Sequence, residues 1–195
     1  MSKSEILQVK PAEHSDIEQV IEVCAENLVS TNREKFSDED FSKHGFLIRK
    51  MTPEEAKEMI DDKENHFLHV VKNGDEVLGY LSGCDLKKTP LDLQEKVFKA
   101  QELQDYIKKN GEKVFYHKQI AKRVSAKNVG KKLLLAMFED AKDRGYGFVV
   151  CRIVYQPFYN EISIAFHEKF GFRKIGEMED NGALLGVYLK DLSGL

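Results

Sequence analysis

The chain has 195 residues, of which 42% are hydrophobic and 32% are charged, and its formal net charge is −3. This length is enough for one compact domain with a sizeable core, and the small negative charge provides no basic field for nucleic acid. The 3 cysteines lie far apart, which argues against a disulfide scaffold. No apolar run approaches the roughly 20 residues that cross a bilayer, and the N-terminus lacks the apolar core of a secretion signal. We therefore expect a cytoplasmic protein with reduced thiols and no membrane or nucleic-acid partner.

Short apolar runs bounded by turn residues predict the strands of the fold. We expect them at 6–9, 67–71, 77–84, 114–122 and 148–154, and in a closing hairpin over 173–189. The pairs Asn73-Gly74 and Asn181-Gly182 each separate two such runs, and this dipeptide is preferred in tight hairpin turns. Only Arg152 interrupts the apolar run at 148–154, so this strand should be covered on both faces.

Single apolar stripes at helical spacing predict the helices. We expect them behind Ser15, after Thr52, over 90–109, over 129–144 and over 160–170. Ser15 and Glu18 form the pattern of a capping box, and Thr52 stands before a proline at a helix start. The resulting order, β-α-α-β-β-α-β-α-β-α-β-β, indicates an α/β fold of mixed α+β character, with a mixed sheet flanked by helices.

The segment from Lys113 to Leu135, KVFYHKQIAKRVSAKNVGKKLLL, carries the strongest functional signal. It begins as a strand, breaks at a short basic loop and resumes at Val129-Gly130 as an amphipathic helix. The first N–H groups of a helix have no intrahelical partner and the helix dipole is positive there, so such a loop suits a phosphate group. The segment predicts an enzyme that binds a phosphorylated carrier.

Four segments resemble the GNAT superfamily of acyl-CoA-dependent N-acyltransferases. They read ILQVKPAEHSDIEQV, KNGDEVLGYLSG, QIAKRVSAKNVGKKLLLAMFEDAKDRGY and NEISIAFHEKFGFRKIGE. The resemblance covers nearly the whole chain and implies one GNAT domain over 1–195, with a helical insertion at about 88–111. It also implies a mostly antiparallel sheet whose central parallel pair splays apart. The implied activity is transfer of an acetyl group from acetyl-CoA to a primary amine of a small molecule or peptide, without a metal.

The phosphate loop departs from the family's pattern of Gln or Arg, two residues, Gly, one residue, then Gly or Ala. Ser125, Asn128 and Gly130 occupy these places. Asn tolerates a positive φ better than most residues, so Asn128 could form the turn, whereas Ser125 cannot supply a long polar side chain. Lys127 and Lys131 keep the loop positive. We expect CoA to bind, more weakly than in members with the full pattern.

The resemblance places the pantetheine of the carrier beside the strand at 114–122 and its pyrophosphate over the loop that follows. The cofactor-binding residues that it implies are Ile120, Ala121, Lys122, Lys127, Asn128, Val129, Gly130, Lys131, Asn160 and Ser163. Asn160 also fits a plain structural role, as the N-cap of the last helix. In that helix His167 occupies the position of a family Tyr that protonates the departing thiolate. Imidazole can act as a general acid near neutral pH, but His167 could also be a helix residue that only contacts the cofactor.

A general base and an acceptor site are less evident. Glu112, Tyr116 and His117 lie near the central strand, but a lone strand His is more often packed, and a neutral amine needs no dedicated base. The acceptor site is expected from residues 28–50 and the last hairpin. Both carry acids, Asp38, Glu39 and Asp40, then Glu177, Glu179 and Asp180. These acids would either attract a cationic amine or form an ordinary solvated face.

One alternative function belongs to a different class, a GNAT-fold module that binds acyl-CoA as a sensor or regulator without turnover. The altered loop and the missing base keep this alternative open. The sequence identifies neither the amine nor the length of the acyl group. A homodimer through the C-terminal edge strand also stays open.

Overall fold

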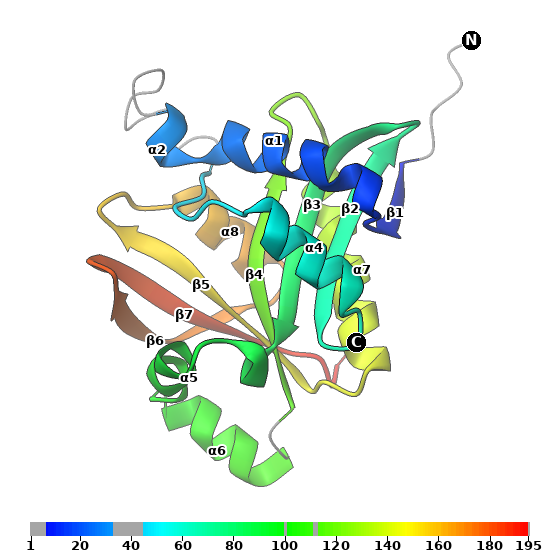
Figure 1. Ribbon diagram of the computed structural model, residues 1–195. Helices are drawn as coiled ribbons and strands as arrows, with labels where there is room; N and C mark the ends of the chain where they lie inside the picture. The colour runs from blue at the N-terminus through cyan, green and yellow to red at the C-terminus, as the bar shows by residue number, and fades with distance from the viewer. Residues whose placement is uncertain (1–6, 33–44, 100, 111–112, 195) are drawn as a thin grey trace.

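The computed structural model describes residues 7–32, 45–99, 101–110 and 113–194, and Figure 1 shows a central sheet flanked by helices. The sheet has 7 strands in the order β1-β2-β3-β4-β5-β7-β6. The strands are β1 Gln8–Pro11, β2 His66–Asn73, β3 Glu76–Asp85, β4 Val114–Lys122, β5 Phe148–Gln156, β6 Arg173–Asp180 and β7 Ala183–Asp191. β4 and β5 are parallel, and all other neighbouring pairs are antiparallel. This confirms the predicted mixed α/β fold with one central parallel pair.

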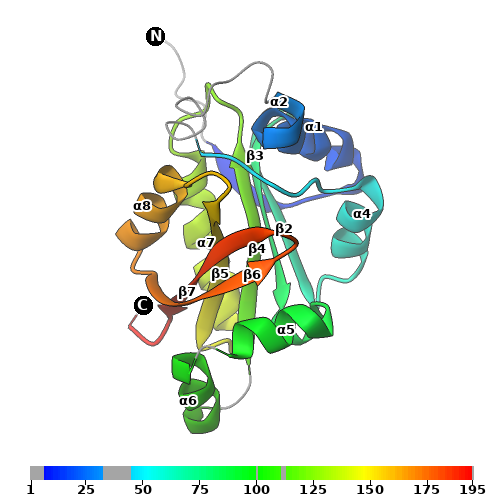
Figure 2. The same ribbon diagram turned by 90° about the vertical axis from the view of Figure 1, so that its left-hand side faces the viewer.

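The helices cover both faces of the sheet. They are the short 3₁₀ helices η1 His14–Asp16 and η2 Leu86–Lys88, with α1 Ile17–Asn27, α2 Val29–Asn32, α4 Pro53–Asp61, α5 Leu91–Phe98, α6 Gln101–Asn110, α7 Val129–Asp143 and α8 Glu161–Lys169. Figure 2 shows α7 and α8 on one side, here called the back face, and α1, α2 and α4 on the other, the front face. Of these described helices, none has the length and apolar character needed to span a membrane.

Three apolar clusters fill the space between the helices and the sheet. The back cluster packs α7 against the sheet and includes Leu133, Leu134, Met137 and Phe138. One front cluster lies under α1 and α4, and the other lies under α5 on the half of the sheet formed by β4 to β7. Because the sheet is covered on both faces at its centre, β5 is buried over most of its length, as its composition predicts.

Both predicted hairpins form, but only the second has its Asn-Gly pair at the centre of the turn. β2 turns into β3 one residue later than predicted, at Gly74-Asp75, where Gly74 has φ +59°. β6 turns into β7 at Asn181 and Gly182, whose φ angles are 49° and 78°. Positive φ at both central residues makes the Asn181-Gly182 turn type I′, which follows the right-handed twist of the two strands.

Helix starts were predicted correctly at α4 and incorrectly at α1. Thr52 caps α4 through a capping box with Glu55, and Pro53 is the first helical residue. At α1 the box is formed by Glu13 and Asp16 instead of Ser15 and Glu18. The buried Asp16 carboxylate accepts the N–H of Glu13 at 3.1 Å and is also paired with the Lys72 ammonium at 2.6 Å. A carboxylate held by a cation is a stronger acceptor than a hydroxyl, so the turn forms around Asp16.

The helix predicted over 90–109 is two helices, α5 and α6. The predicted apolar stripe is correct, because Leu93, Val97 and Leu103 are buried in the front cluster under α5. A single straight helix of this length would extend about 30 Å, whereas two short helices can direct both halves of the stripe to one core. Thr89 does not cap α5; its hydroxyl donates to the carbonyl of Leu86 at 2.7 Å.

Candidate active site

The central parallel pair is joined over only part of its length. β4 and β5 pair from Val114↔Phe148 to His117↔Cys151, and no pairing follows. Both strands continue beyond this point and diverge, as Figure 1 shows. We call this opening the splay. Beyond His117 the edge of β4 that faces β5 presents backbone N–H and C=O groups without a partner on that strand.

A β-bulge lies in β4 at the narrow end of the splay. The ladder with β3 pairs Gly83 with His117 and Ser82 with Gln119, which leaves Lys118 without a partner. Beyond the bulge, β4 stays paired with β3 to its end. A bulge turns the strand locally and increases its twist. One edge of β4 is thus held by β3 while the other is open.

The loop after β4 brings a helix N-terminus to the wide end of the splay. Asn128 has φ 61° and ψ 3° and is the N-cap of α7. Asn128 thus adopts the left-handed conformation that we expected of it in the phosphate loop. The N–H of Lys132 donates to the Asn128 carbonyl at 3.2 Å, so the N–H groups of the residues between them have no acceptor within the helix.

The side chains around this loop make it positive. Lys127 and Lys131 are exposed, and the first turn of α7 contains no acidic residue. Lys122 is half-buried, with its Nζ 3.4 Å from the carbonyl oxygens of Arg123 and Val124, and burial lowers its pKa. Free N–H groups, the positive end of a helix dipole and nearby ammonium groups together can hold an anion such as a pyrophosphate.

Several predicted cofactor residues can contribute only their backbone. Ala121 is buried in the front cluster under α1 and α4, and Val129 is buried in the back cluster. Ile120 packs on the back face, where its Cδ1 lies 3.8 Å from the position of a Cβ added to Gly130. The same added Cβ would lie 3.4 Å from Cζ of Phe166, an ordinary van der Waals contact, so Gly130 lies beside Phe166 of α8.

Asn160 joins α8 to the front of the molecule. Its Oδ1 accepts the N–H of Ser163 at 3.2 Å, which confirms its role as the N-cap. Its Nδ2 donates to the carbonyl of Phe46 at 3.1 Å, in a segment far away in sequence. The side chain is 4% exposed, so these two bonds account for a buried amide. These two hydrogen bonds show that Asn160 has a structural role. Its contact with a cofactor stays a prediction.

His167 is buried, and only one of its ring nitrogens has a partner. Nδ1 lies 2.7 Å from the carbonyl oxygen of Ser163, and since a carbonyl can only accept, Nδ1 carries the proton. Nε2 is buried without a hydrogen-bond partner. Burial lowers the pKa of His167 to about 4. The imidazole is therefore neutral near pH 7, with an unprotonated Nε2.

His117 lies against His167 at the narrow end of the splay. The ring centroids are 5.4 Å apart, and the His117 Nδ1 is 3.4 Å from the carbonyl oxygen of Ser82. Burial, and to a lesser extent the neighbouring His167, lower the pKa of His117 to about 3. His117 is 3% exposed, as the interpretation of a packed strand residue requires. Glu112, the other acid considered as a base, lies outside the described residues.

The acids predicted near the acceptor are largely paired or lie outside the described residues. Asp180 accepts from Arg152 at 2.7 Å and from Lys96 at 2.8 Å. Glu177 is paired with Lys174 at 2.5 Å. The acids at 38–40 fall outside the described residues. Among the described acids, Asp180 is thus offset by two cations, and the solvated-face interpretation fits the exposed Glu177 and Glu179 better.

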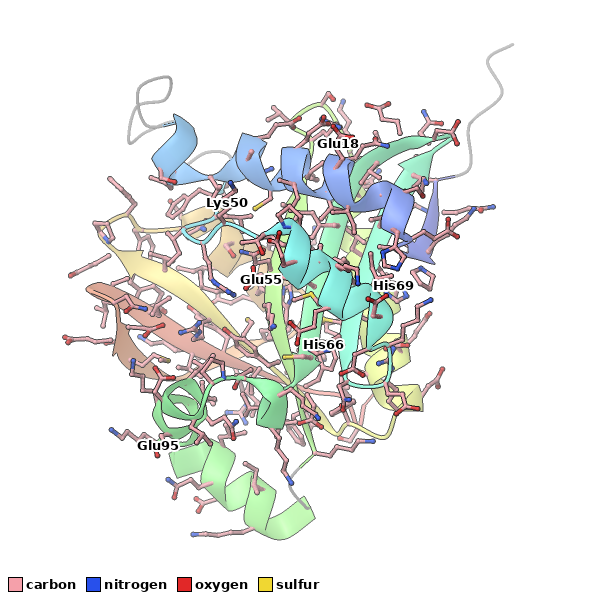
Figure 3. All side chains as sticks on the ribbon, in the orientation of Figure 1. Glu18, Lys50, Glu55, His66, His69 and Glu95 are labelled. Atoms are coloured by element: carbon pink, nitrogen blue, oxygen red, sulfur yellow. The ribbon has the colours of Figure 1, made fainter. Side chains whose placement is uncertain are left out.

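The segment before α4 crosses the front of β4. The Gln119 Nε2 donates to the carbonyl of Arg49 at 2.6 Å, and the hydroxyl of Tyr80 donates to Gln119 at 3.1 Å. Figure 3 shows Lys50 and Glu55 at this crossing, and Glu55 also pairs with Arg49. The segment therefore lies beside the splay on the face opposite α7 and α8. Among the described residues no cluster of three or more His, Cys, Asp or Glu is suited to a metal ion.

A family model described as the acetyltransferase (GNAT) family matches residues 32–172. The chain belongs to this family. Comparison with curated proteins gave no significant match. Solved structures with the same fold include an N-acetyltransferase from Staphylococcus aureus Mu50, with 19% identity, a TM-score of 0.63, and coverage of 96% of this chain and 99% of that one.

Two further GNAT-like structures contain a carrier according to their descriptions. One is YncA, a putative acetyltransferase from Salmonella typhimurium with acetyl-CoA, at 17% identity and a TM-score of 0.64, covering 96% of this chain and 95% of that one. The other is the PaiA N-acetyltransferase from Thermoplasma acidophilum with coenzyme A, at 15% identity and a TM-score of 0.61, covering 95% and 99%. At these identities the likeness establishes the shared fold.

The structure thus assembles most of the predicted GNAT site residues around one opening. The loop residues from Lys127 to Lys131 lie at its wide end, and His167 lies near its narrow end beside His117. Sequence reasoning missed the contacts of Arg152 with Tyr116 and Asp180. The only sequence signal for them was a single charged residue in an otherwise apolar strand.

Proposed function

We propose that this GNAT protein is an acetyl-CoA-dependent N-acetyltransferase that acts on a primary amine of a small molecule or peptide. The observation that carries the proposal is the splay, whose open β4 edge leads directly to the N-terminus of α7. Residues 1–195 would form one domain, in which α5 and α6 are an insertion that packs its apolar stripe on the sheet. The acetyl-CoA and coenzyme A in the described neighbours support the choice of carrier.

In this proposal the carrier lies along the open edge of β4. The pantetheine adds to the strand as an extra strand would, beside the backbone of Ile120, Ala121 and Lys122. The pyrophosphate lies at the free N–H groups of the first turn of α7. Lys127 and Lys131 supply positive charge near it. Ser163 and Asn160, at the start of α8, border the pantetheine from the back face.

The reaction requires one bond to form, one to break and one proton to move. The neutral amine attacks the thioester carbonyl carbon, the C–N bond forms, the C–S bond breaks, and sulfur leaves as a thiolate. The backbone N–H groups of the open edge, near the bulge at Lys118, can stabilise the oxyanion that develops. Holding the amine beside the thioester supplies much of the acceleration in such a transfer.

His167 would handle the proton. Because its Nδ1–H is committed to Ser163, only the unprotonated Nε2 is available. Nε2 takes the proton that the amine loses and returns it to the departing thiolate, so the imidazole ends each cycle neutral. A resting imidazolium is not required, which is consistent with a pKa of about 4.

The test separates binding from turnover. We expect acetyl-CoA and CoA to bind in isothermal titration, and a panel of primary amines to release CoA thiol in the presence of the protein. His167→Phe should keep the acetyl-CoA affinity within a few-fold and lower kcat by about 10²-fold or more, the usual contribution of a positioned acid or base. Tight binding without turnover on any amine would support the non-catalytic module instead. No binding to either ligand would overturn the carrier assignment.

A further inference from the structure

Arg152 is a charged residue on the front face of β5, between the apolar Val150 and Val154 of the front cluster. It is the first residue of β5 beyond the last ladder pair, His117↔Cys151, and so stands at the narrow end of the splay. Its side chain is 17% exposed. A guanidinium in such a position is costly unless each of its donors finds an acceptor.

Two of the three guanidinium nitrogens are satisfied by the protein. Nε donates to the hydroxyl of Tyr116 at 2.7 Å, and Nη1 donates to Oδ2 of Asp180 at 2.7 Å. Nη2 makes no hydrogen bond with the described residues, and it is not fully shielded from solvent. One donor edge of Arg152 is therefore open to a ligand on the front of the splay.

The local charge balance is positive. Asp180 is shared, because Lys96 also donates to it, at 2.8 Å, so two cations face one half-buried carboxylate. Lys96 also lies 3.7 Å from Asp92, but the side chain of Asp92 is 69% exposed and its charge is screened by water. Among the described residues beside Arg152, Asp180 is thus shared by two cations, and the exposed Asp92 offsets the charge of Lys96 only weakly.

A second cation stands across the splay. Extending the β4–β5 register by one residue would place Lys118, the bulge residue, opposite Arg152. Lys118 is half-buried and lies against the thiol of Cys84, on the front face. It has no carboxylate within ion-pair distance among the described residues. Two cations from the two diverging strands therefore lie on the front face at the narrow end of the splay.

We propose that the acceptor amine carries a carboxylate, which binds to the open Nη2 edge of Arg152 and is attracted by Lys118. This assignment rests on the proposed acetyl transfer and places the entering amine on the front face of the splay. The N–H groups of Nη2 can donate to a carboxylate oxygen, and a site in which Asp180 already offsets part of the positive charge suits a monoanion better than a phosphate dianion. The apolar surroundings of Arg152 strengthen the attraction. The substrate class is then amino acids or peptides with a carboxylate near the amine, not cationic polyamines.

The first arm of the test needs no mutation. Acetyl transfer is measured with L-amino acids and with their C-terminal amides, and with ethanolamine phosphate beside ethanolamine. The amine of an amide is less basic, so reactivity alone favours the amides. We expect kcat/KM to be at least about tenfold higher for the acids, as one charge-assisted hydrogen bond allows. Equal use of acids and amides, or a preference confined to the phosphate, would overturn the carboxylate assignment.

The second arm uses Arg152→Gln with Lys174→Gln as a matched control. Lys174 is a surface cation on β6 whose side chain is 41% exposed. The acid-to-amide ratio of kcat/KM should fall toward one in Arg152→Gln and stay unchanged in Lys174→Gln, with acetyl-CoA binding as the check on folding. A parallel fall for acids and amides would show that Arg152 has a structural role only. If Arg152→Gln does not fold, Lys118→Gln replaces it. We then expect a smaller fall in the acid-to-amide ratio of kcat/KM. An unchanged ratio would count against the proposal.

A third arm separates this inference from the proposed function. 3-Phenylpropanoate, a carboxylate without an amine, is titrated into the CoA-saturated protein and the Arg152→Gln variant. Binding to the wild type that is lost in the variant supports the carboxylate site even if no amine is acetylated, in which case the proposed transfer fails alone. Absence of binding, while acetyl-CoA binds normally and amines are acetylated, overturns the carboxylate site and leaves the transfer intact.

Discussion

The imidazole rings of His117 and His167 lie with their centroids 5.4 Å apart, one on the central strand and the other on α8. Both are 3% exposed, and neither has a carboxylate to stabilise its charged form among the described residues. The pair lies where β4 and β5 separate. It therefore links the stability of the fold to the protonation state of the site.

Acid should destabilise the protein through these two groups. Their pKa values are about 3 and 4 when folded, against about 6.5 in an unfolded chain. Between pH 6.5 and pH 4 the unfolded state binds more protons, so the stability that is complete above pH 6.5 is lost as the pH falls. Each imidazole should cost about 2 kcal/mol between pH 7.5 and pH 5. Urea unfolding at both pH values tests this, and His167→Phe should remove about half of the pair's contribution.

The pH dependence of turnover should follow the acceptor amine. If Nε2 of His167 works from the neutral imidazole, kcat/KM should rise with pH as the amine loses its proton and then level off. No descending limb near pH 6.5 is expected, because the pKa of His167 is already lowered to about 4. A pH–rate profile with two amines of different basicity is the measurement. A fall in rate between pH 6 and 7 that is common to both amines would mean that the imidazolium is the active form.

Asn128 should tolerate Gly but not a β-branched residue. Its φ of 61° is easily adopted by Gly and is strained for Val. Asn128→Val should lose about 1–3 kcal/mol of stability and bind acetyl-CoA more weakly, since the turn sets the direction of the first N–H groups of α7. Asn128→Gly should stay within about 1 kcal/mol of the wild type. Thermal unfolding and isothermal titration on both variants would test the pair, and equal behaviour would contradict it.

Two glycines near the loop should respond differently to alanine. At Gly79 a Cβ would lie 2.6 Å from Cγ1 of Val129 and 2.7 Å from the carbonyl oxygen of Ala121, so Gly79→Ala should cost about 1–3 kcal/mol. At Gly130 the nearest atom, in Phe166, is 3.4 Å away, an ordinary contact. Gly130→Ala should therefore fold normally but weaken acetyl-CoA binding, because it adds bulk to the first turn of α7, whose free N–H groups form the proposed pyrophosphate site. Unfolding curves and titrations on both variants separate packing from binding.

The two hydrogen bonds of Asn160, the cap of α8 and the bond to Phe46, should make separate contributions to stability. Asn160→Ala removes the cap of α8 and the bond to Phe46, and we expect a loss of about 2 kcal/mol. Asn160→Ser keeps a capping oxygen and removes only the bond to Phe46, so its loss should be about half as large. Thr52→Ala, which removes the cap of α4, serves as a control of about 1 kcal/mol. Equal losses for both Asn160 variants would mean that the cap contributes little.

The elements around the proposed carrier site were predictable because their signals are local. The bounds predicted for β4 are the observed ones, and α7 begins at the predicted Val129. The basic loop, the glycine and the long apolar stripe of α7 are compatible with few structures other than a strand that leads through a turn into a helix. The start of α1 was predicted less well, because Asp16 is held by Lys72, a residue of another strand that local sequence does not reveal.

The acceptor side was least predictable because its contacts join distant parts of the chain. Asp180 has the sequence pattern of a solvated hairpin acid, yet it holds Arg152 from β5 and Lys96 from α5. His167 fits a polar helix position, yet Phe172 and His117 enclose it. Charge and spacing along the chain cannot show such pairings, which decide whether a carboxylate is free to attract a ligand.

The splay also bears on how this sheet avoids aggregation. An unpaired strand edge normally invites a strand from another molecule. The outer edges of this sheet are protected by composition, since β1 ends at Pro11 and β6 carries charged residues along its length. The open edge of β4 instead lies inside the sheet, with α8 behind it and the segment around Arg49 in front. A polypeptide strand that paired there would project its side chains toward α8 on one face and toward the segment around Arg49 on the other, so this edge is poorly placed to accept a strand from another molecule.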